Sequence, residues 1–377
     1  MTGPGSGESW WREVCARCGR AWDLSARLWR CRCGGLLDLV GPVVDPLAGL
    51  PAPPSGRYLQ RYRPALPPGG AGVDLGAEVT PAVAVRPGVW VKADYEQPTG
   101  SFKDRGAAVM IGVAASLGVA SVMIDSSGNA GRAVARCAAR AGLDCTVYLP
   151  AGTGPAKVRA IAGSGASVIE VPGGRAAAAA AAVAAASAPG APFYASHVHQ
   201  PSFHHGVKTL AFELYEQVAD LENGTVVVPA GNGTLVLGLW LGFGDLMASG
   251  RAGRRPAIVA VQADRCAPLL GPRPAGDGRA APDPTSTAAT GIAIPDPPRA
   301  AQIRGAAVAS GGAVLAVSED DIGAATAELH GLGFPVEATG AVAWAALPSL
   351  RSARPGGPGG GRPGPVVAVL TGRSSPG

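Results

Sequence analysis

The stretch that decides the fold is PTGSFKDRG, residues 98–106, with Lys103 near its centre. It follows a β-branched and aromatic run at residues 89–91, which predicts a strand, and leads into apolar residues 107–111, which predict a helix. Gly100 lets the backbone approach a ligand closely. A lysine on such a turn, beside apolar neighbours, loses its proton more readily than a solvated lysine, as Schiff-base formation requires. Taken alone, the stretch also fits a solvated lysine that opens a helix.

Short apolar segments alternate with alanine-rich segments from residue 89 to about 195 and again after residue 205. Such alternation predicts parallel strands joined by crossover helices, an α/β fold. We expect strands at residues 120–124, 144–149, 167–171, 225–228, 258–262, 313–317 and 366–370, and helices at residues 130–141, 155–163, 176–188, 206–218 and from 235 onward. Three Pro- and Gly-rich segments interrupt the pattern: an arm at residues 41–87 and loops at 271–300 and 351–365.

Two glycine-containing turns are candidate anion sites. The loop PAGNGT, residues 229–234, lies between a predicted strand and a predicted helix. Its backbone N–H groups can converge on a phosphate, and the helix N-terminus adds a partial positive charge. It has neither the Gly-Lys-Ser/Thr of a Walker A loop nor the dinucleotide fingerprint. The loop SSGNAG, residues 126–131, is a second turn of this kind, although Ser and Asn also favour ordinary helix starts.

Cysteines gather at the start of the chain, where a C-x2-C pair and a C-x-C-G-G pair are separated by twelve residues. Two close pairs followed by glycine predict a zinc-ribbon-like knuckle at residues 11–40, with Cys15, Cys18, Cys31 and Cys33 as metal ligands. Zinc in this site would be structural, because no ligand position stays open; four free thiols are the alternative. An odd total of seven cysteines argues against a disulfide framework.

Composition excludes several classes of protein. The chain has 377 residues, 47% of them hydrophobic, and a formal charge of +5 with scattered arginines, so nucleic acid is not the expected partner. No apolar run approaches the roughly 20 residues that span a bilayer. The first 13 residues lack the basic start and apolar core of a signal peptide, and we therefore expect a cytoplasmic protein. A histidine cluster at residues 197–205 does not favour a metal, because no Cys or carboxylate completes the set.

Taken in order, these segments resemble the threonine synthase-like family of fold-type-II (tryptophan synthase beta-like) pyridoxal-phosphate (PLP) enzymes. The resemblance rests on SFKDRG and on residues 126–131, 205–209, 228–234 and 370–372, and it runs from about Cys15 to Gly372. It implies two three-layer α/β domains with the cofactor in the cleft between them. We expect a large PLP-binding domain at residues 41–118 and 206–377, and a small substrate-gripping domain at residues 119–205.

The resemblance also implies residue roles. Lys103 would be the catalytic lysine that carries PLP as a Schiff base. Other residues would bind the cofactor: Asn129 at its phenolic oxygen, Gly231, Asn232, Gly233 and Thr234 at its phosphate, and Thr371 at its ring nitrogen. The substrate would be held by Ser126, Ser127, Gly128 and Ala130. A neutral partner at the ring nitrogen suits elimination and replacement at the β or γ carbon.

The reaction implied is conversion of O-phosphohomoserine and water to threonine and phosphate, by a homodimer acting on a small amino-acid substrate. The sequence departs from the family at Phe203, where threonine synthases have an arginine that holds the substrate phosphate, and at Ala130, often a threonine. Phe203 therefore predicts a preference for an uncharged or smaller amino acid. The alternatives are β-elimination or β-replacement on serine, threonine, cysteine or an activated serine, and a silent PLP- or amino-acid-binding sensor.

Overall fold

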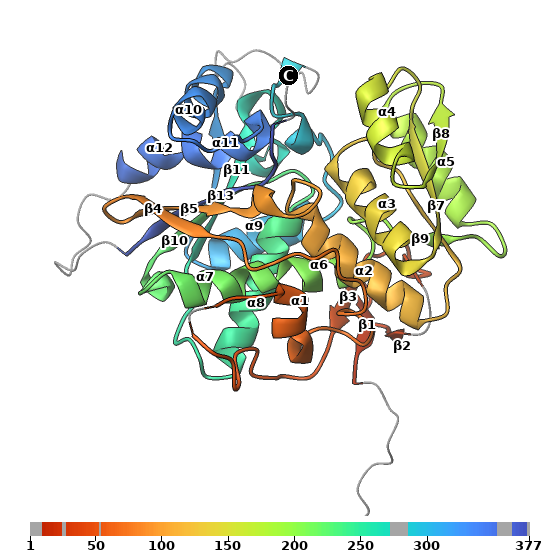
Figure 1. The fold of residues 1–377 in the computed structure, drawn as a ribbon, viewed down its shortest axis with the longest axis horizontal. Coiled ribbons are helices and arrows are strands. Elements are labelled where there is room, and N and C mark those ends of the chain that lie inside the picture. The colour runs from red at the N-terminus through yellow and green to blue at the C-terminus, as the bar shows by residue number, and fades with distance from the viewer. Residues whose placement is uncertain (1–9, 25–27, 53, 272–285, 353–363, 375–377) are drawn as a thin grey trace, which may run out of the picture. The chain divides into compact units, whose positions relative to one another are not determined.

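The computed structural model describes residues 10–24, 28–52, 54–271, 286–352 and 364–374 (Figure 1). The chain forms two compact units, and each is built from segments that are distant in the sequence. Unit 1 comprises residues 1–44, 62–75 and 104–206, and unit 2 comprises residues 45–61, 76–103 and 207–377. No helix among the described residues is long and apolar enough to cross a membrane.

Unit 2 is built on a six-stranded sheet in the order β12-β11-β10-β13-β5-β4. Neighbouring strands are parallel except for the antiparallel pair β4 and β5. The strands are β4 (Ala82–Arg86), β5 (Val89–Ala93), β10 (Thr225–Pro229), β11 (Ala257–Ala263), β12 (Val314–Val317) and β13 (Val366–Leu370). The helices are α1 (Tyr58–Arg61), α7 (Thr209–Gln217), α8 (Thr234–Ala248), α9 (Ala300–Ala309), α10 (Glu319–Gly331), α11 (Ala338–Ala345) and α12 (Leu347–Ser352).

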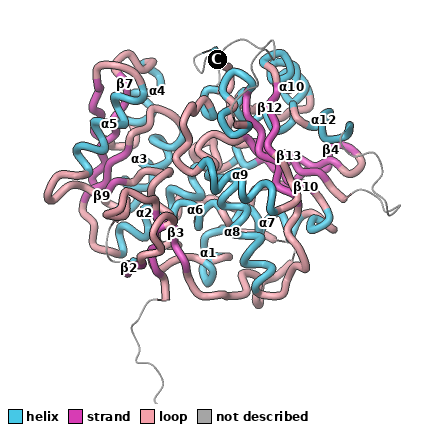
Figure 2. Tube along the Cα trace, turned by 180° about the vertical axis from the view of Figure 1, so that it is seen from behind, coloured by secondary structure: helices cyan, strands magenta, loops and turns pink. Residues whose placement is uncertain are grey.

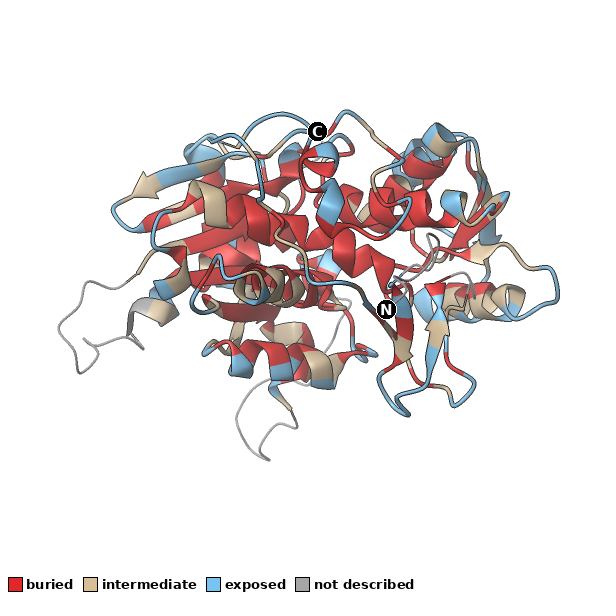
Figure 3. Cartoon of the chain, turned by 90° about the horizontal axis from the view of Figure 1, so that it is seen from below, coloured by how far each residue is buried: buried red, intermediate tan, exposed pale blue. Residues whose placement is uncertain are grey.

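Helices cover both faces of this sheet, as a parallel sheet requires. Helices α10, α11 and α12 pack on one face, and α7, α8 and α9 pack on the other (Figures 1 and 2). The central strand β10 reads TVVVP and every residue in it is buried, which is typical of a strand covered on both sides. Buried residues accordingly run along the strands and the inward helix faces (red in Figure 3). Unit 2 is thus a three-layer α/β sandwich, as the alternating pattern predicts.

Unit 1 contains a four-stranded parallel sheet in the order β8-β7-β6-β9 and the three-stranded antiparallel sheet β2-β1-β3. Helices α3 and α4 pack together on the parallel sheet, and α5 covers its other face (Figure 1). The strands are β1 (Arg12–Cys15), β2 (Ala21–Asp23), β3 (Leu37–Val40), β6 (Ser121–Ile124), β7 (Asp144–Pro150), β8 (Ser167–Val171) and β9 (Phe193–Tyr194). The helices are α2 (Lys103–Ser116), α3 (Asn129–Ala141), α4 (Pro155–Ala162), α5 (Arg175–Ala186) and α6 (Ser202–Val207), of which α2 begins, and α6 ends, with a residue of unit 2.

Two segments cluster differently from the predicted domain ranges. Residues 104–118, which include all of α2 after its first residue, and residues 62–75 of the arm belong to unit 1 rather than to the larger unit. Glycines explain this packing, because they let α2 approach unit 1 without side chains between them. A Cβ on Gly112 would collide with the backbone of Gly69, and a Cβ on Gly106 would collide with the ring of Phe203. The cysteine-rich segment also belongs to unit 1.

The predicted loops also need correction. The segment 271–300 was expected to lack regular structure, but its described part contains a 3₁₀ turn at Thr290–Ile292 and ends where α9 begins. Residues 272–285 and 353–363 of the two predicted loops lie outside the described residues. The arm at residues 41–87 contains β4 and the short helix α1, and its aromatic residues Tyr58 and Tyr62 are fully buried, as anchors should be.

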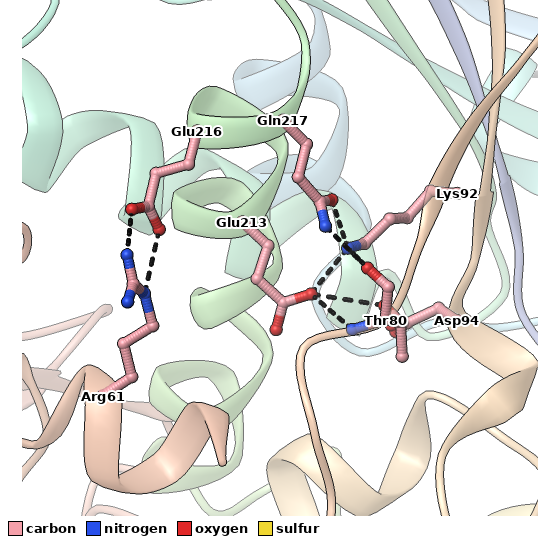
Figure 4. Close-up of polar contacts among 7 residues, drawn as sticks. All are labelled: Arg61, Thr80, Lys92, Asp94, Glu213, Glu216 and Gln217. Atoms are coloured by element: carbon pink, nitrogen blue, oxygen red, sulfur yellow. Dashed lines mark hydrogen bonds and ion pairs between the residues drawn. The ribbon is translucent and has the colours of Figure 1, made fainter. Parts of the chain in front are cut away.

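A buried polar network joins this arm to the sheet and to α7 (Figure 4). The Nζ of Lys92, on β5, donates to the Thr80 carbonyl at 2.6 Å, to Glu213 Oε2 at 2.6 Å and to Gln217 Oε1 at 2.7 Å. The Thr80 hydroxyl donates to Asp94 Oδ1 at 2.9 Å. Strand β5 and the residues after it lead directly to Lys103, so the network fixes the strand from which the lysine turn departs.

Candidate active site

Lys103 follows a tight turn that the sequence encodes with glycine. Gly100 has a φ of 81°, a left-handed value that side chains disfavour, and its N–H donates to the Gln97 carbonyl at 2.7 Å. The Lys103 N–H lies 3.3 Å from Ser101 Oγ, and Lys103 is the first residue of α2. The predicted strand–turn–helix order around Lys103 is therefore confirmed.

The end of β13 holds this turn in place. The Phe102 N–H donates to the Thr371 carbonyl at 3.0 Å, and the Arg373 N–H donates to the Gly100 carbonyl at 2.8 Å. Because β13 and β5 are parallel neighbours, the segments after both strands emerge at the same edge of the sheet. Residues 100–102 and residues 371–373, near the end of the chain, thereby meet beside Lys103.

The glycine-rich loop follows β10, the other neighbour of β13, and leads into α8. Lys103 Nζ lies 3.4 Å from the hydroxyl oxygen of Thr234, the first residue of that helix. Gly233 has a φ of 73°, and a Cβ there would collide with Ile303; a Cβ on Gly231 would lie 2.9 Å from the Cα of Ile292. The loop is thus a backbone cradle at the N-terminus of a 15-residue helix, with an amine at its edge.

Thr371 is almost fully buried and lies beside the start of α11. A Cβ on Gly340 would lie 3.5 Å from Thr371 Oγ1, and the Glu337 N–H donates to the Gly372 carbonyl at 2.9 Å. The sequence pattern does not predict α11, Ala338–Ala345, and so gives no sign that Glu337 is a neighbour of this site. The available signal was an acidic residue directly before an alanine-rich run, which favours a helix start.

The loop at residues 126–131 belongs to unit 1 and leads into α3 as predicted. The Gly128 N–H approaches Ser126 Oγ at 3.4 Å, so this hydroxyl is engaged within the loop. The side chain of Ala130 is buried, whereas Ser127 and Asn129 are half-buried and Gly128 is exposed. The helix N-terminus and the Ser127 and Asn129 side chains are the polar groups the loop can offer to an anion.

The four N-terminal cysteines converge as the zinc-ribbon pattern predicts. Their four Sγ atoms all lie within 4.8 Å of one another, with 3.5 Å between Cys15 and Cys33 and 3.6 Å between Cys18 and Cys31. Zn–S bonds of about 2.3 Å in a tetrahedron place sulfurs about 3.8 Å apart, so this set fits zinc. A Cβ on Gly35 would lie 2.6 Å from the Cys15 sulfur, which explains the glycine there.

The electrostatics at Cys15 favour a metal-binding thiolate. Burial raises the pKa of this thiol, but hydrogen bonds from the N–H groups of Cys18 and Arg17 and from the Cys33 and Cys18 side chains outweigh burial and lower the pKa to about 6, while burial and the neighbouring thiols raise the pKa of Cys31 to about 12. Thiolate rather than thiol is the form that binds metal. Within the described parts of the chain, this is the group of Cys, His, Asp or Glu side chains close enough to hold a metal ion.

Two histidines of the cluster at residues 197–205 contact the N-terminal segment within unit 1. The His205 ring nitrogen Nε2 lies 2.8 Å from the Leu39 carbonyl, and the His199 ring packs edge-on against Trp29 at 5.2 Å. The Phe203 side chain is 0% exposed and packs against Gly106 within unit 1.

Lysine, glycine cradle and buried threonine at one edge of a parallel sheet define a cofactor-dependent α/β enzyme. The family model described as "Pyridoxal-phosphate dependent enzyme" matches residues 74–372, and the chain belongs to that family. It is 29% identical over 327 residues to the threonine synthase of Methanocaldococcus jannaschii, covering 82% of this chain and 80% of that one. It is 31% identical over 265 residues to the threonine synthase of Methanosarcina acetivorans, covering 70% and 65% of the two chains.

Solved structures show the same fold. The processed form of threonine deaminase isoform 2 from Solanum lycopersicum aligns with a TM-score of 0.68 and 21% identity, over 89% of this chain and 90% of that chain. Maize serine racemase aligns with a TM-score of 0.64 and 21% identity, over 79% and 89%. The predicted fold class, cofactor and enzyme class are thus confirmed: the protein is a fold-type-II, PLP-dependent lyase of the threonine synthase-like group.

Proposed function

We propose that the protein converts O-phosphohomoserine and water to threonine and phosphate. The observation that carries this proposal is the similarity to threonine synthases over 82% of the chain, combined with a lysine amine placed at the edge of a glycine cradle. Conversion at the γ and β carbons also suits a neutral hydroxyl, rather than a carboxylate, at the cofactor ring nitrogen.

The residues of unit 2 fit PLP. The N–H groups of Gly231, Asn232 and Gly233 and the Thr234 hydroxyl would hold its phosphate, because they lie at a helix N-terminus in a loop whose two glycines have no Cβ atoms. The Thr371 hydroxyl would bond its ring nitrogen. When bound, PLP supplies an electron sink for the substrate carbons. Lys103 would hold the cofactor covalently and, once released from it, carry protons at the α and β carbons of the substrate.

The residues of unit 1 are proposed to bind the substrate and one oxygen of the cofactor. The amide of Asn129 would donate to the phenolic oxygen of PLP. Ser127 and the N–H groups of Gly128 and Ala130, at the start of α3, would hold the substrate carboxylate. Ser126 is proposed to bind the carboxylate as well, because its hydroxyl oxygen accepts from the Gly128 N–H at 3.4 Å and its O–H can still donate to a substrate.

The cysteine knuckle is proposed to hold a structural zinc ion through Cys15, Cys18, Cys31 and Cys33. The spacing of the four sulfurs supports this proposal, and a closed four-sulfur set leaves no position for a substrate. Its contribution is to the stability of a segment that buries only a small core of its own, around Leu37.

A second candidate is elimination or replacement at the β carbon of serine, threonine or an activated serine. It is favoured by the absence of the family's phosphate-binding arginine, since Phe203 occupies that sequence position and is buried. Losing one charged hydrogen bond would weaken recognition of a phosphorylated substrate by about 1.5–3 kcal/mol, or roughly ten- to a hundredfold.

The two candidates differ in their products. Purified, PLP-loaded protein should be incubated separately with O-phosphohomoserine, L-serine, L-threonine and O-phosphoserine, and released phosphate, ammonia and amino acids measured. Formation of threonine and phosphate in equal amounts from O-phosphohomoserine, with the highest kcat/KM of the panel, is the expected result. Ammonia release from serine or threonine at higher kcat/KM would overturn the proposal in favour of the second candidate.

A further inference from the structure

An aromatic cluster links the cysteine knuckle to the parallel sheet of unit 1. The Trp29 ring packs edge-on against Tyr194 at 5.4 Å and against His199 at 5.2 Å, between ring centroids. Trp29 precedes the metal-site residue Cys31 by two positions, so the fold of the knuckle sets where its ring lies. Such edge-to-face pairs contribute beyond the area they bury, and they fix the orientation of the rings.

Tyr194 connects this aromatic cluster to the start of the loop at residues 126–131. Its hydroxyl donates to Asp125 Oδ1 at 2.7 Å, and Asp125 stands between the last residue of β6 and Ser126. The backbone is tied as well: Met123 of β6 pairs with Tyr194 of β9, and the Ala195 N–H donates to the Met123 carbonyl at 2.7 Å. A hydrogen bond to a carboxylate is short and directional, so this one fixes the Tyr194 ring and the Asp125 side chain relative to each other.

The loop itself has little freedom to absorb a displacement at Asp125. Gly131, in the first turn of α3, lies so close to the Ser126 carbonyl that a Cβ there would collide with it. A shift of Asp125 would therefore move the N–H groups at the helix start that are proposed to hold the substrate carboxylate. Trp29, Tyr194 and Asp125 form a continuous path from the knuckle to those groups.

We propose that Trp29, Tyr194 and Asp125 are positioning residues for the loop at residues 126–131, so that the knuckle sets the affinity for the amino-acid substrate. This inference rests on the proposed role of that loop in substrate binding. It assigns the knuckle a part in recognition in addition to its part in stability. A role in packing alone would instead leave loop dynamics and substrate affinity unchanged once the protein is folded.

The decisive variant is Tyr194→Phe, which removes the hydroxyl and keeps the ring that packs on Trp29. Its matched control is Tyr148→Phe on β7, because the Tyr148 ring packs on the same cluster as Tyr194. Hydrogen exchange of the amides at residues 126–131 is measured in PLP-loaded protein without substrate. We expect exchange about tenfold faster in Tyr194→Phe than in the control, from loss of one charge-assisted bond. If the amides at residues 126–131 exchange at the wild-type rate in Tyr194→Phe, the inference is overturned.

Kinetics provide the second readout, with O-phosphohomoserine and L-serine as the probes. Tyr194→Phe should raise KM about tenfold while the affinity for PLP, followed by absorbance titration, stays at the wild-type value. Trp29→Ala should do the same, and Trp29→Phe should restore most of the affinity because it restores the ring contact. Faster loop exchange without turnover of either probe would support the inference and defeat the proposed function. Turnover with unchanged KM in both Tyr194→Phe and Trp29→Ala would defeat the inference alone.

Discussion

Glu213→Leu is expected to destabilise the protein more than most single substitutions. Both side chains of the Lys92–Glu213 pair are 0% exposed. Without the carboxylate, the buried ammonium loses its 2.6 Å contact with Glu213 Oε2 and is left beside neutral acceptors that include the Thr80 carbonyl and Gln217 Oε1. Removing one partner of a buried ion pair costs about 3–5 kcal/mol, because the remaining charge loses both water and counter-ion.

The double variant Lys92→Met with Glu213→Leu removes both charges and should cost less than Glu213→Leu alone. What remains is the loss of the acceptor for the Thr80 N–H, which lies 3.2 Å from Glu213 Oε2. An unsatisfied buried donor costs about 1–3 kcal/mol. With about 3–5 kcal/mol for each single variant, the double-mutant cycle should give a coupling energy of at least about 3 kcal/mol.

The assay is urea-induced unfolding of PLP-loaded protein for the wild type, both single variants and the double variant. The control is Asp45→Asn, which breaks the exposed ion pair of Asp45 with Arg251 in the same unit and should cost less than about 1 kcal/mol. The reasoning is refuted if Glu213→Leu costs no more than the control, or if the double variant costs the sum of the two single variants.

Four further predictions follow from the site. Lys103→Ala should abolish the covalent cofactor bond, as seen by borohydride trapping and peptide mass spectrometry; trapping on another lysine would contradict the assignment. Cys31→Ser should remove stoichiometric zinc and lower the thermal midpoint, whereas freshly purified wild-type protein without zinc would refute the metal site. Burial raises the pKa of Asp125 above its unfolded value of about 3.9, so the folded chain retains a proton that the unfolded chain has lost. The unfolding free energy should therefore fall as pH rises through that window, and an unchanged pH profile in Asp125→Asn would contradict this. Phe203→Arg should bury an unpaired guanidinium and lower the unfolding free energy by about 3–5 kcal/mol, without improving kcat/KM for O-phosphohomoserine; a stable variant with improved kcat/KM would refute the packing role.

Local signals in the sequence were sufficient to predict most elements of the sheet and several helix ends. The strand expected at residues 167–171 has those bounds in the structure, and Gly142 ends α3 with a φ of 69°. Ser318 caps α10 by accepting from the Asp321 N–H, an arrangement that a serine before an acidic first turn favours. In each case the determining interaction lies within a few residues of the element it defines.

Elements that depend on distant contacts were missed. Helix α9 lies at the end of a segment that reads as a loop, and Ile303 on it packs beside Gly233, far away in the sequence. The network around Lys92 joins three segments of the chain, and none of them carries a local signal for the others. The same limit applies to the site, where the proximity of Lys103 to Thr234 follows from the order of strands in the sheet.

Substrate choice is the part of the function that local motifs decide least. Phe203 matches the position of a family arginine in the sequence, but its ring fills space beside Gly106 and leaves no cation in its place. The departure at Ala130 also has little effect on binding, because this side chain is buried and only its N–H can reach a ligand. What the loop offers to a substrate is then a helix N-terminus and the polar side chains of Ser127 and Asn129, which suit the carboxylate that every amino acid shares. Selection between phosphohomoserine and serine must therefore come from protein groups that contact the leaving group of the substrate. Comparing kcat/KM for the four substrates named above measures the effect of those groups directly.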